Sequence, residues 1–205
     1  MKKLLLISYK NKQELIQKRL NEFSSLSREK QFDEFIFCLL TPQSNAKKCW
    51  EAVEQLKLLE KWNTQNIIEI LKTKTRFHNN KAKYLLKANR SFSIISPSLK
   101  DNNNKNIKEL RNFIADNVKG YGLKESSHFL RNIGKSHNQI AILDRHILKN
   151  LLKLNIITQK DTKIKNKVHY QEIEQKFLSF SKSIGIPLDS LDLLFWSNEN
   201  GEVFK

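Results

Sequence analysis

The chain has 205 residues, of which 37 are Lys or Arg and 21 are Asp or Glu, and its net charge is +16. This length suffices for one large domain or two small helical subdomains with a real core, and no apolar run is long enough to span a membrane. The basic excess indicates a polyanionic partner, usually nucleic acid, although a merely solvated basic surface would have the same charge.

Helix breakers are scarce, since the chain has only five glycines and three prolines. Long segments with helical spacing therefore predict an all-α protein. Thr64 is expected to cap its own helix, and polar and Lys-rich loops are expected at 101–104 and 159–168, with no catalytic residue in the second. In chain order, the predicted helices cover residues 13–23, 32–40, 46–60, 64–71, 81–95, 107–117, 124–133, 144–154, 170–183 and 188–197.

The N-terminus and the cysteines bear on compartment and cofactors. Residues 1–8 mimic the start of a signal peptide, but their apolar core is too short and no cleavage-like site follows. We therefore expect a soluble, intracellular protein. Cys38 and Cys49, the only cysteines, are expected to be reduced structural thiols, and they are too few for a four-cysteine iron–sulfur cluster. We expect no cofactor.

The most informative segment is Val118-Lys119-Gly120-Tyr121-Gly122-Leu123-Lys124. Between two predicted helices it indicates a hairpin in which the amides of Gly120 and Gly122 approach a phosphate, because a Cβ would block positive φ and close contact. Lys124 falls in the first turn of the next helix, whose positive end favours a nucleophilic amine over an ammonium. Asp144 has the position of a helix N-cap, where backbone N–H groups keep a carboxylate ionised. Such an amine and carboxylate suit attack at an anomeric carbon of DNA.

These residues resemble the helix-hairpin-helix DNA glycosylases, and in particular the archaeal-type 8-oxoguanine DNA glycosylase/AP lyases. The similarity extends from about Phe35 to the C-terminus. It implies one glycosylase domain, 1–205, in which two helical subdomains flank a DNA-binding cleft: a central bundle of about 32–118, and an N- and C-terminal subdomain carrying the hairpin 118–124. The segments that carry the resemblance are Gly120-Tyr121-Gly122-Leu123-Lys124-Glu125-Ser126-Ser127-His128-Phe129-Leu130-Arg131-Asn132-Ile133-Gly134, Leu143-Asp144-Arg145-His146-Ile147-Leu148, Leu193-Leu194-Phe195-Trp196 and Gly201-Glu202-Val203-Phe204-Lys205.

The resemblance implies a base-excision repair enzyme that flips 8-oxoguanine out of double-stranded DNA and excises it. Lys124 would attack C1′ of the damaged nucleotide, expel the base and form a Schiff base, after which β-elimination would release the 3′ phosphate. Asp144 would stabilise oxocarbenium-like charge and assist proton movement at Lys124. The plainer alternatives are a phosphate-binding role for Lys124 and a capping role alone for Asp144.

Four further residues are assigned to the damaged base by resemblance. Gln43 would fill the hole that the flipped base leaves, and Trp196 would stack on that base. The α-carboxylate of Lys205 would accept the N7–H that 8-oxoguanine has and guanine lacks. Phe77 would line the same pocket. The alternatives are a polar helix-start residue for Gln43, a core position for Trp196 and a frayed end for Lys205.

In this superfamily the hairpin carbonyls often hold a monovalent cation, which here would involve the main chain of Asp116, Val118 and Tyr121; the alternative is a plain tight turn. No other metal is expected. The expected partner is double-stranded DNA containing oxidised guanine, the expected state is a monomer, and no membrane is involved.

Two other functions stay open at this point. One is a glycosylase for another oxidised base, such as an oxidised pyrimidine, which would use the same Lys124 and Asp144. The other is a non-catalytic helix-hairpin-helix module that only grips phosphate. The flanking residues His128, Arg131, Arg145 and His146 are either contacts to the DNA backbone or surface and packing residues.

Overall fold

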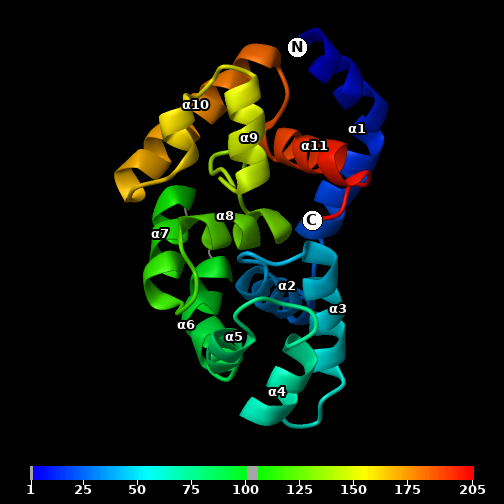
Figure 1. Cartoon of the computed structure of the whole chain (residues 1–205), viewed down its shortest axis with the longest axis vertical. Coiled ribbons are helices and arrows are strands. Elements are labelled where there is room, and N and C mark those ends of the chain that lie inside the picture. The colour runs from blue at the N-terminus through cyan, green and yellow to red at the C-terminus, as the bar shows by residue number, and fades with distance from the viewer. Residues whose placement is uncertain (1, 101–105) are drawn as a thin grey trace. The chain divides into compact units, whose positions relative to one another are not determined.

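The structure is a computed structural model that describes residues 2–100 and 106–205. Its described residues form helices and no strands, which confirms the all-α prediction (Figure 1). The polar loop expected at 101–104 lies outside the described residues. The helices are α1 (Lys2–Ser24), α2 (Arg28–Leu40), α3 (Ala46–Lys57), α4 (Thr64–Leu71), α5 (His78–Leu85), α6 (Ala88–Lys100), α7 (Ile107–Asn117), α8 (Leu123–Asn132), α9 (Arg145–Lys153), η1 (Gln159–Thr162), α10 (Lys167–Ile184) and α11 (Leu188–Asn200).

The chain divides into two compact units. The central unit consists of residues 26–129 and the terminal unit consists of residues 1–25 and 130–205. The boundary after Phe129 falls within α8, so the hairpin 118–124 belongs to the central unit. The family resemblance implies a hairpin in the N- and C-terminal subdomain. Here it groups with the central unit, because the side chain of Tyr121 packs among the aromatic rings of the central core.

An aromatic cluster forms the core of the central unit. The ring of Phe35, on α2, lies 5.4 Å from that of Phe92, 5.1 Å from that of Tyr121 and 5.6 Å from that of Phe129. Phe35 and Phe129 have no exposed surface. Because large aromatic side chains bury the most area per residue, this cluster fixes α2, α6, the hairpin and α8 to one another.

The terminal unit is built around α11, which packs against α1, α9 and α10. Phe195 of α11 stacks on Phe177 of α10 with ring centroids 5.9 Å apart. On its other side, α11 lies beside α1, as Figure 1 shows in red and blue. There Lys12 donates to Ser197 Oγ at 3.1 Å and to Asn198 Oδ1 at 2.9 Å. The N-terminal and C-terminal helices therefore stabilise each other.

The first helix was predicted to begin at residue 13, but α1 begins at Lys2. Its extra turns are mostly exposed, so their weak amphipathic pattern does not reveal a helix. Contacts with α11 hold them: Leu5 is buried, and Ser8 donates a hydrogen bond to Asn198 at 3.0 Å. Residues 2–8 of the segment that mimics the start of a signal peptide are part of this helix.

The single helix predicted over 81–95 is two helices, α5 and α6, with a break at 86–87. The second one also continues past Pro97 to Lys100. Proline removes the N–H that would bond the carbonyl four residues earlier, which is that of Ser93. The hydroxyl of Ser96 donates to this carbonyl at 3.5 Å, which lessens the cost of Pro97.

Two smaller predictions are also corrected. The residue that caps α4 is Asn63, not Thr64: its side chain accepts from Asn66 N–H, and the Asn66 side chain accepts from Asn63 N–H. The Lys-rich segment 159–168 contains the short helix η1. A capping box stabilises its start, in which the carboxylate of Asp161 accepts from Thr158 N–H at 2.9 Å.

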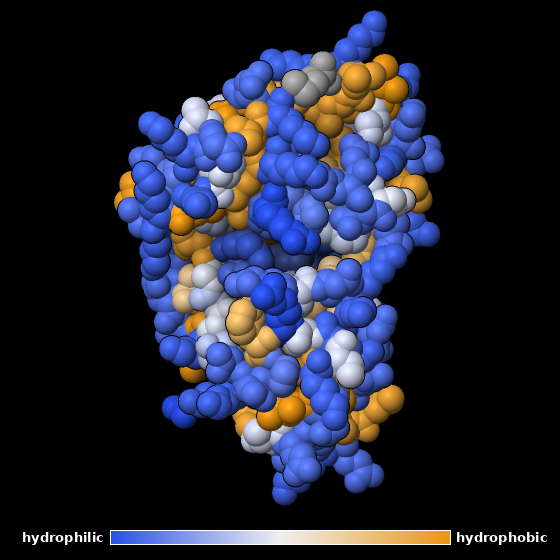
Figure 2. Space-filling model, viewed as in Figure 1, coloured by the Kyte–Doolittle hydropathy of each residue, from blue (hydrophilic) through white to orange (hydrophobic). Residues whose placement is uncertain are grey.

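The surface of the protein is in keeping with its composition. Hydrophilic side chains predominate on the face shown in Figure 2, and the chain carries a net charge of +16. Among the described residues, no helix combines the length and the apolar character that crossing a membrane requires.

Candidate active site

Tyr121 anchors the hairpin to the central core. Its hydroxyl donates to the carbonyl of Phe35 at 2.7 Å, and its ring is almost fully buried. Burial raises the pKa of Tyr121 well above its usual value, so the hydroxyl stays a donor. A tight turn follows Val118, whose carbonyl accepts from Tyr121 N–H at 3.1 Å. The hairpin is therefore a rigid element.

The two hairpin glycines have different reasons for being glycine. Gly120 has φ +98°, and a Cβ there would lie 2.6 Å from Cδ2 of Tyr84. Gly122 has no positive φ, and its N–H donates to Glu125 Oε2 at 3.1 Å. In the free protein the amide of Gly122 is therefore bonded to Glu125, and a phosphate that binds this amide has to replace that carboxylate.

Lys124 is in the first turn of α8, as the sequence predicted. Its side chain is 25% exposed, and Nζ lies 3.0 Å from Glu125 Oε1. Glu125 thus contacts both the hairpin amide and the amine. The result is a partly exposed primary amine at the positive end of a helix, next to a carboxylate that solvent reaches less easily.

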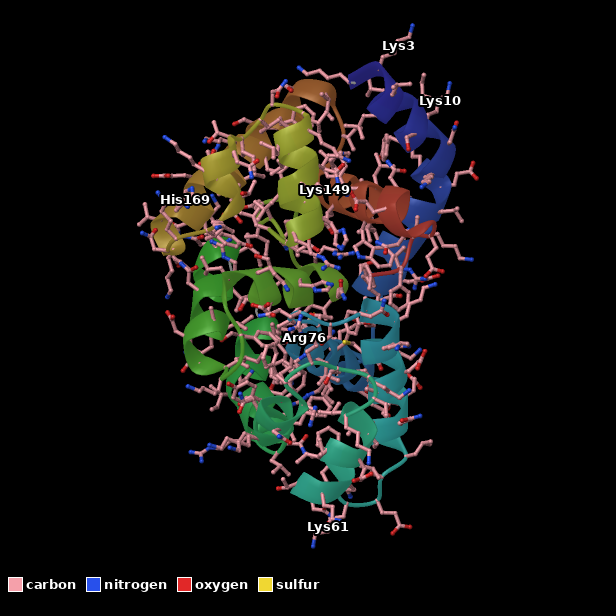
Figure 3. All side chains as sticks on the ribbon, viewed as in Figure 1. Lys3, Lys10, Lys61, Arg76, Lys149 and His169 are labelled. Carbon is pink, nitrogen blue, oxygen red and sulfur yellow. The ribbon has the colours of Figure 1, made fainter. Side chains whose placement is uncertain are left out.

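Gln43 and Phe77 lie at the surface of the central unit. Both have positive φ, 54° and 56°, although neither is glycine. Such backbone costs energy in residues with a Cβ and persists only where the surroundings hold it. Phe77 is 52% exposed, and the guanidinium of Arg76, labelled in Figure 3, lies 5.5 Å from its ring centroid. Gln43 is also exposed.

Lys81 and Ser44, which the sequence analysis did not single out, hold this region together. Lys81 is 4% exposed, and Nζ donates to Leu40 O at 2.7 Å, Pro42 O at 2.9 Å and Ser44 Oγ at 2.8 Å. Burial lowers the pKa of Lys81 to about 8. One signal in the sequence does single out this residue: Lys81 and Leu85 are on the same face of α5 as the buried Ala82, so a lysine interrupts an apolar face.

The two cysteines are free thiols, and both are buried, as predicted. The thiol of Cys49 donates to the carbonyl of Leu40 at 3.2 Å, which Lys81 also contacts. Burial raises the pKa of Cys49 to about 11, against the opposing effects of Lys81 and Lys124. This thiol is therefore protonated near neutral pH and belongs to the structural support of the loop.

Asp144 is the N-cap of α9, as predicted: Oδ1 accepts from the N–H groups of His146 and Ile147, both at 2.8 Å. Among the described residues, both hydrogen bonds of this side chain end on that one oxygen. The segment before it is fixed by Tyr170, whose hydroxyl donates to Ala141 O at 2.6 Å. The carboxylate of Asp144 is therefore fixed in position through Oδ1, while Oδ2 is available to bind another group.

A buried charged pair supports this unit. Arg131 Nη2 lies 3.2 Å from Asp192 Oδ2, and both side chains are less than a tenth exposed. Burial raises the pKa of Asp192 to about 7, although Arg131 acts in the opposite direction and Asp144 and Asp189 add to the rise. Arg131 is thus a packing residue, as is His128, whose ring lies 5.6 Å from that of Phe37. Arg145 is exposed, and His146 is half-buried.

The C-terminal end is ordered against the terminal unit. Trp196, half-buried on α11, lies 5.9 Å from the ring of Phe204. Lys205 is 9% exposed, and its Nζ lies 5.9 Å from the ring of Phe23 on α1. Phe204 and Lys205 therefore have packing contacts, unlike the frayed end that is the alternative for Lys205.

The predicted site residues thus fall into two sets. The central unit holds Gln43, Phe77, Gly120, Gly122 and Lys124, with Asp116, Val118 and Tyr121 at the hairpin. The terminal unit holds Asp144, Trp196 and Lys205. Within the first set, Ser44 accepts both Arg76 N–H, at 2.9 Å, and Lys81 Nζ, so the segments of Gln43 and Phe77 are directly connected. Within the second set, the ring of Trp196 lies beside that of Phe204, and Phe204 directly precedes Lys205 in the chain.

Comparison with known proteins identifies the family. Residues 16–186 match the family model described as 8-oxoguanine DNA glycosylase. The 8-oxoguanine DNA glycosylase/AP lyase of Fusobacterium nucleatum is 39% identical over 208 residues, covering 96% of this chain and 94% of the relative.

Solved structures agree. The 8-oxoguanine DNA glycosylase of Thermotoga maritima matches with a TM-score of 0.86 and 26% identity, over 100% of this chain and 98% of that one. The 8-oxoguanine glycosylase/lyase of Methanocaldococcus jannaschii, in complex with 15mer DNA containing 8-oxoguanine, matches with a TM-score of 0.82 and 30% identity. This match covers 98% of this chain and 100% of that one. The family model and these relatives show that this chain, which carries the hairpin, Lys124 and the helix-capping Asp144, belongs to the 8-oxoguanine DNA glycosylase family.

Proposed function

We propose that the protein excises 8-oxoguanine from double-stranded DNA and cleaves the resulting abasic site. The observation that carries this proposal is the position of Lys124 in the first turn of α8, directly after the hairpin, in a chain of this family. The amine attacks C1′ of the damaged nucleotide, and the base leaves with the electrons of the N-glycosidic bond. The amine loses its proton and the sugar ring opens at the C1′–O4′ bond, which gives a Schiff base. Loss of a proton from C2′ then expels the 3′ phosphate by β-elimination.

Asp144 stabilises the positive charge that develops on the sugar as the base leaves. Two backbone N–H groups hold Oδ1, so Oδ2 is the oxygen that faces the sugar. A carboxylate fixed in advance stabilises developing charge without reorganisation at the moment of reaction. The same oxygen is suited to move the proton of Lys124. Capping and catalysis are compatible because they use different oxygens.

Gln43 fills the hole that the flipped base leaves in the duplex, and Phe77 lines the pocket of that base. Support comes from the exposure of both side chains and from the connection between their segments through Ser44. An amide is suited to this role because it pairs with the orphaned base while it fills the space.

Trp196 stacks on the flipped base, and the α-carboxylate of Lys205 accepts its N7–H. The burial of Lys205 supports this assignment, because a recognition acceptor has to be held in place. Guanine has a lone pair at N7, so it gains nothing from the same acceptor.

The hairpin grips a DNA phosphate through the amide of Gly120, and through that of Gly122 once Glu125 releases it. A monovalent cation fits the main-chain carbonyls of Asp116, Val118 and Tyr121, since carbonyls at a helix end lack partners within the helix. The Val118 carbonyl already accepts one hydrogen bond, which leaves its second lone pair for a cation. When bound, the cation would add positive charge beside the phosphate.

Borohydride trapping on an 8-oxoguanine duplex tests the proposal. The wild-type protein should form a covalent adduct with DNA, and Lys124→Gln should form none while it keeps most of its affinity for DNA. Lys119→Gln, an exposed lysine of the same hairpin, is the matched control and should still be trapped. Trapping retained in Lys124→Gln would assign the nucleophile to another amine.

The same assay separates the two rival functions. A non-catalytic DNA-binding module would form no adduct with any lesion. A glycosylase for oxidised pyrimidines would be trapped faster on an oxidised pyrimidine than on 8-oxoguanine. The names of the relatives, 8-oxoguanine DNA glycosylase/AP lyase, favour the first proposal over both rivals.

A further inference from the structure

Lys81 is a buried lysine to which the proposed reaction gives no role. Its Nζ donates to three acceptors, the carbonyls of Leu40 and Pro42 and the hydroxyl of Ser44, at 2.7, 2.9 and 2.8 Å. An ammonium has three donors, so these contacts use its full capacity. All three acceptors are at the end of α2 or in the loop that follows, which contains Gln43.

Lys81 also joins this loop to the segment of Phe77. Ser44 Oγ accepts a second hydrogen bond, from Arg76 N–H at 2.9 Å, and Arg76 directly precedes Phe77. The main-chain N–H of Lys81 donates to Phe77 O at 3.0 Å. One buried side chain, with Ser44 as its partner, therefore connects both segments.

Both segments contain strained backbone at the residue that faces solvent. Gln43 and Phe77 have positive φ, and neither has a glycine's freedom to adopt it. Such conformations persist only where other contacts hold them. The contacts of Lys81 are of this kind, since they reach the carbonyls of Leu40 and Pro42 before Gln43 and the hydroxyl of Ser44 after it.

We propose that Lys81 is a positioning residue for base flipping: it holds the Gln43 loop and the Phe77 segment in one arrangement, so that both side chains meet the duplex already in place. This inference rests on the proposed function, which assigns Gln43 to the duplex and Phe77 to the flipped base. Holding the two side chains in advance reduces the ordering that DNA binding would otherwise require.

A role in filling space does not account for a lysine at this position. Burying an ammonium is costly, and an apolar side chain of similar length would fill the same volume without that cost. What the ammonium adds is three directed hydrogen bonds, one to the last residue of α2 and two to the loop of Gln43 that follows it.

The experiment compares Lys81→Met with Lys83→Met, an exposed lysine of the same helix, in the full-length protein. Amide hydrogen exchange of residues 41–45 and 75–78 is measured without DNA. Flipping is followed by the fluorescence of 2-aminopurine placed beside 8-oxoguanine in a duplex, and excision by single-turnover kinetics. Cleavage of an abasic site in single-stranded DNA needs no flipping and serves as the internal reference.

Lys81→Met should exchange faster in both segments and should flip and excise about tenfold more slowly, as expected for the loss of several hydrogen bonds from a charged donor. Its cleavage of the single-stranded abasic site should stay within about twofold of wild type, and so should every readout of Lys83→Met. In a Gln43→Ala background, Lys81→Met should add little, because it acts through that loop.

Ser44→Ala provides a second route if Lys81→Met folds poorly. It keeps the ammonium but removes the acceptor shared with Arg76, and it should slow flipping about threefold. The inference would be overturned if Lys81→Met left amide exchange unchanged in both segments. It would also be overturned if the rate losses of Lys81→Met and Gln43→Ala simply multiplied in the double variant. A wild-type protein that excises nothing would instead defeat the proposed function, and the exchange data would still decide the role of Lys81.

Discussion

Glu125 pairs with Lys124: its Oε1 lies 3.0 Å from Lys124 Nζ, while its Oε2 accepts the N–H of Gly122 at 3.1 Å. One carboxylate therefore occupies both groups that the proposed function uses at the hairpin. DNA has to compete with Glu125 for the amide, and the amine has to leave the ion pair before it reaches a sugar.

Glu125→Gln is expected to bind duplex DNA about two- to fivefold more tightly at low salt. The amide oxygen of Gln still accepts from Gly122 N–H, but a negative charge beside the phosphate is gone, an effect of ~0.5–1 kcal/mol at a partly exposed site. The dissociation constant is measured against salt concentration, with Glu172→Gln, exposed on α10, as the control. Weaker binding would mean that the charge of Glu125 is needed to hold the hairpin.

Asp144→Asn should lower the rate of excision by about a hundredfold or more, because a neutral amide stabilises developing positive charge poorly. Its stability should hardly change, since Asn caps helices as well as Asp does. Single-turnover excision and chemical denaturation are measured together. Asp144→Ala, which loses both roles, should also lose ~1 kcal/mol of stability. Excision by Asp144→Asn at the wild-type rate would leave Asp144 a cap alone.

Removal of Lys205 should impair excision of 8-oxoguanine about ten- to a hundredfold, corresponding to ~1.5–3 kcal/mol for a buried hydrogen bond to a charged group. Cleavage of an existing abasic site should survive, because it needs Lys124 but no base pocket. Lys205→Ala is the control, since it removes the ammonium over Phe23 but keeps the terminal carboxylate in register. Equal excision by the full chain and by one ending at Phe204 would exclude this carboxylate from recognition.

Tyr121→Phe should lower the free energy of unfolding by ~1–3 kcal/mol, because it leaves the buried carbonyl of Phe35 without the hydroxyl that lies 2.7 Å away. Urea denaturation measures the change. Tyr84→Phe is the matched control: the ring of Tyr84 lies against Gly120, and Phe retains that packing. If the two variants lose equal stability, the hydroxyl of Tyr121 does not anchor the hairpin.

Asp192 is expected to make stability depend on pH. Its pKa is raised from 3.8 to about 7 in the folded protein, so between these values the folded state holds a proton that the unfolded state has released. The free energy of unfolding should therefore fall as pH rises from about 4 to about 7, by up to ~1.4 kcal/mol per pH unit. Urea titrations of wild type and Asp192→Asn at several pH values check this, because the difference between them isolates Asp192. Parallel pH curves would contradict the raised pKa.

The sequence by itself determined the helical class, the hairpin and the cap at Asp144, but not the cap of α4. Helical spacing and cap residues are local, so α7 spans the predicted residues 107–117 and Asp144 is an N-cap, as expected. Lys124 enters the first turn of α8 for the same reason: the glycine spacing before it leaves little choice of backbone.

Only the tertiary structure shows which groups Lys81, Glu125 and Lys205 contact. Lys81 is one of 37 basic residues, and its importance depends on acceptors at residues 40, 42 and 44 that the fold brings to it. The last residue is held by its contact with Phe23, at the far end of the chain. Periodicity reports which face of a helix is apolar. It does not report which distant backbone atoms meet that face, because those contacts depend on how the helices pack.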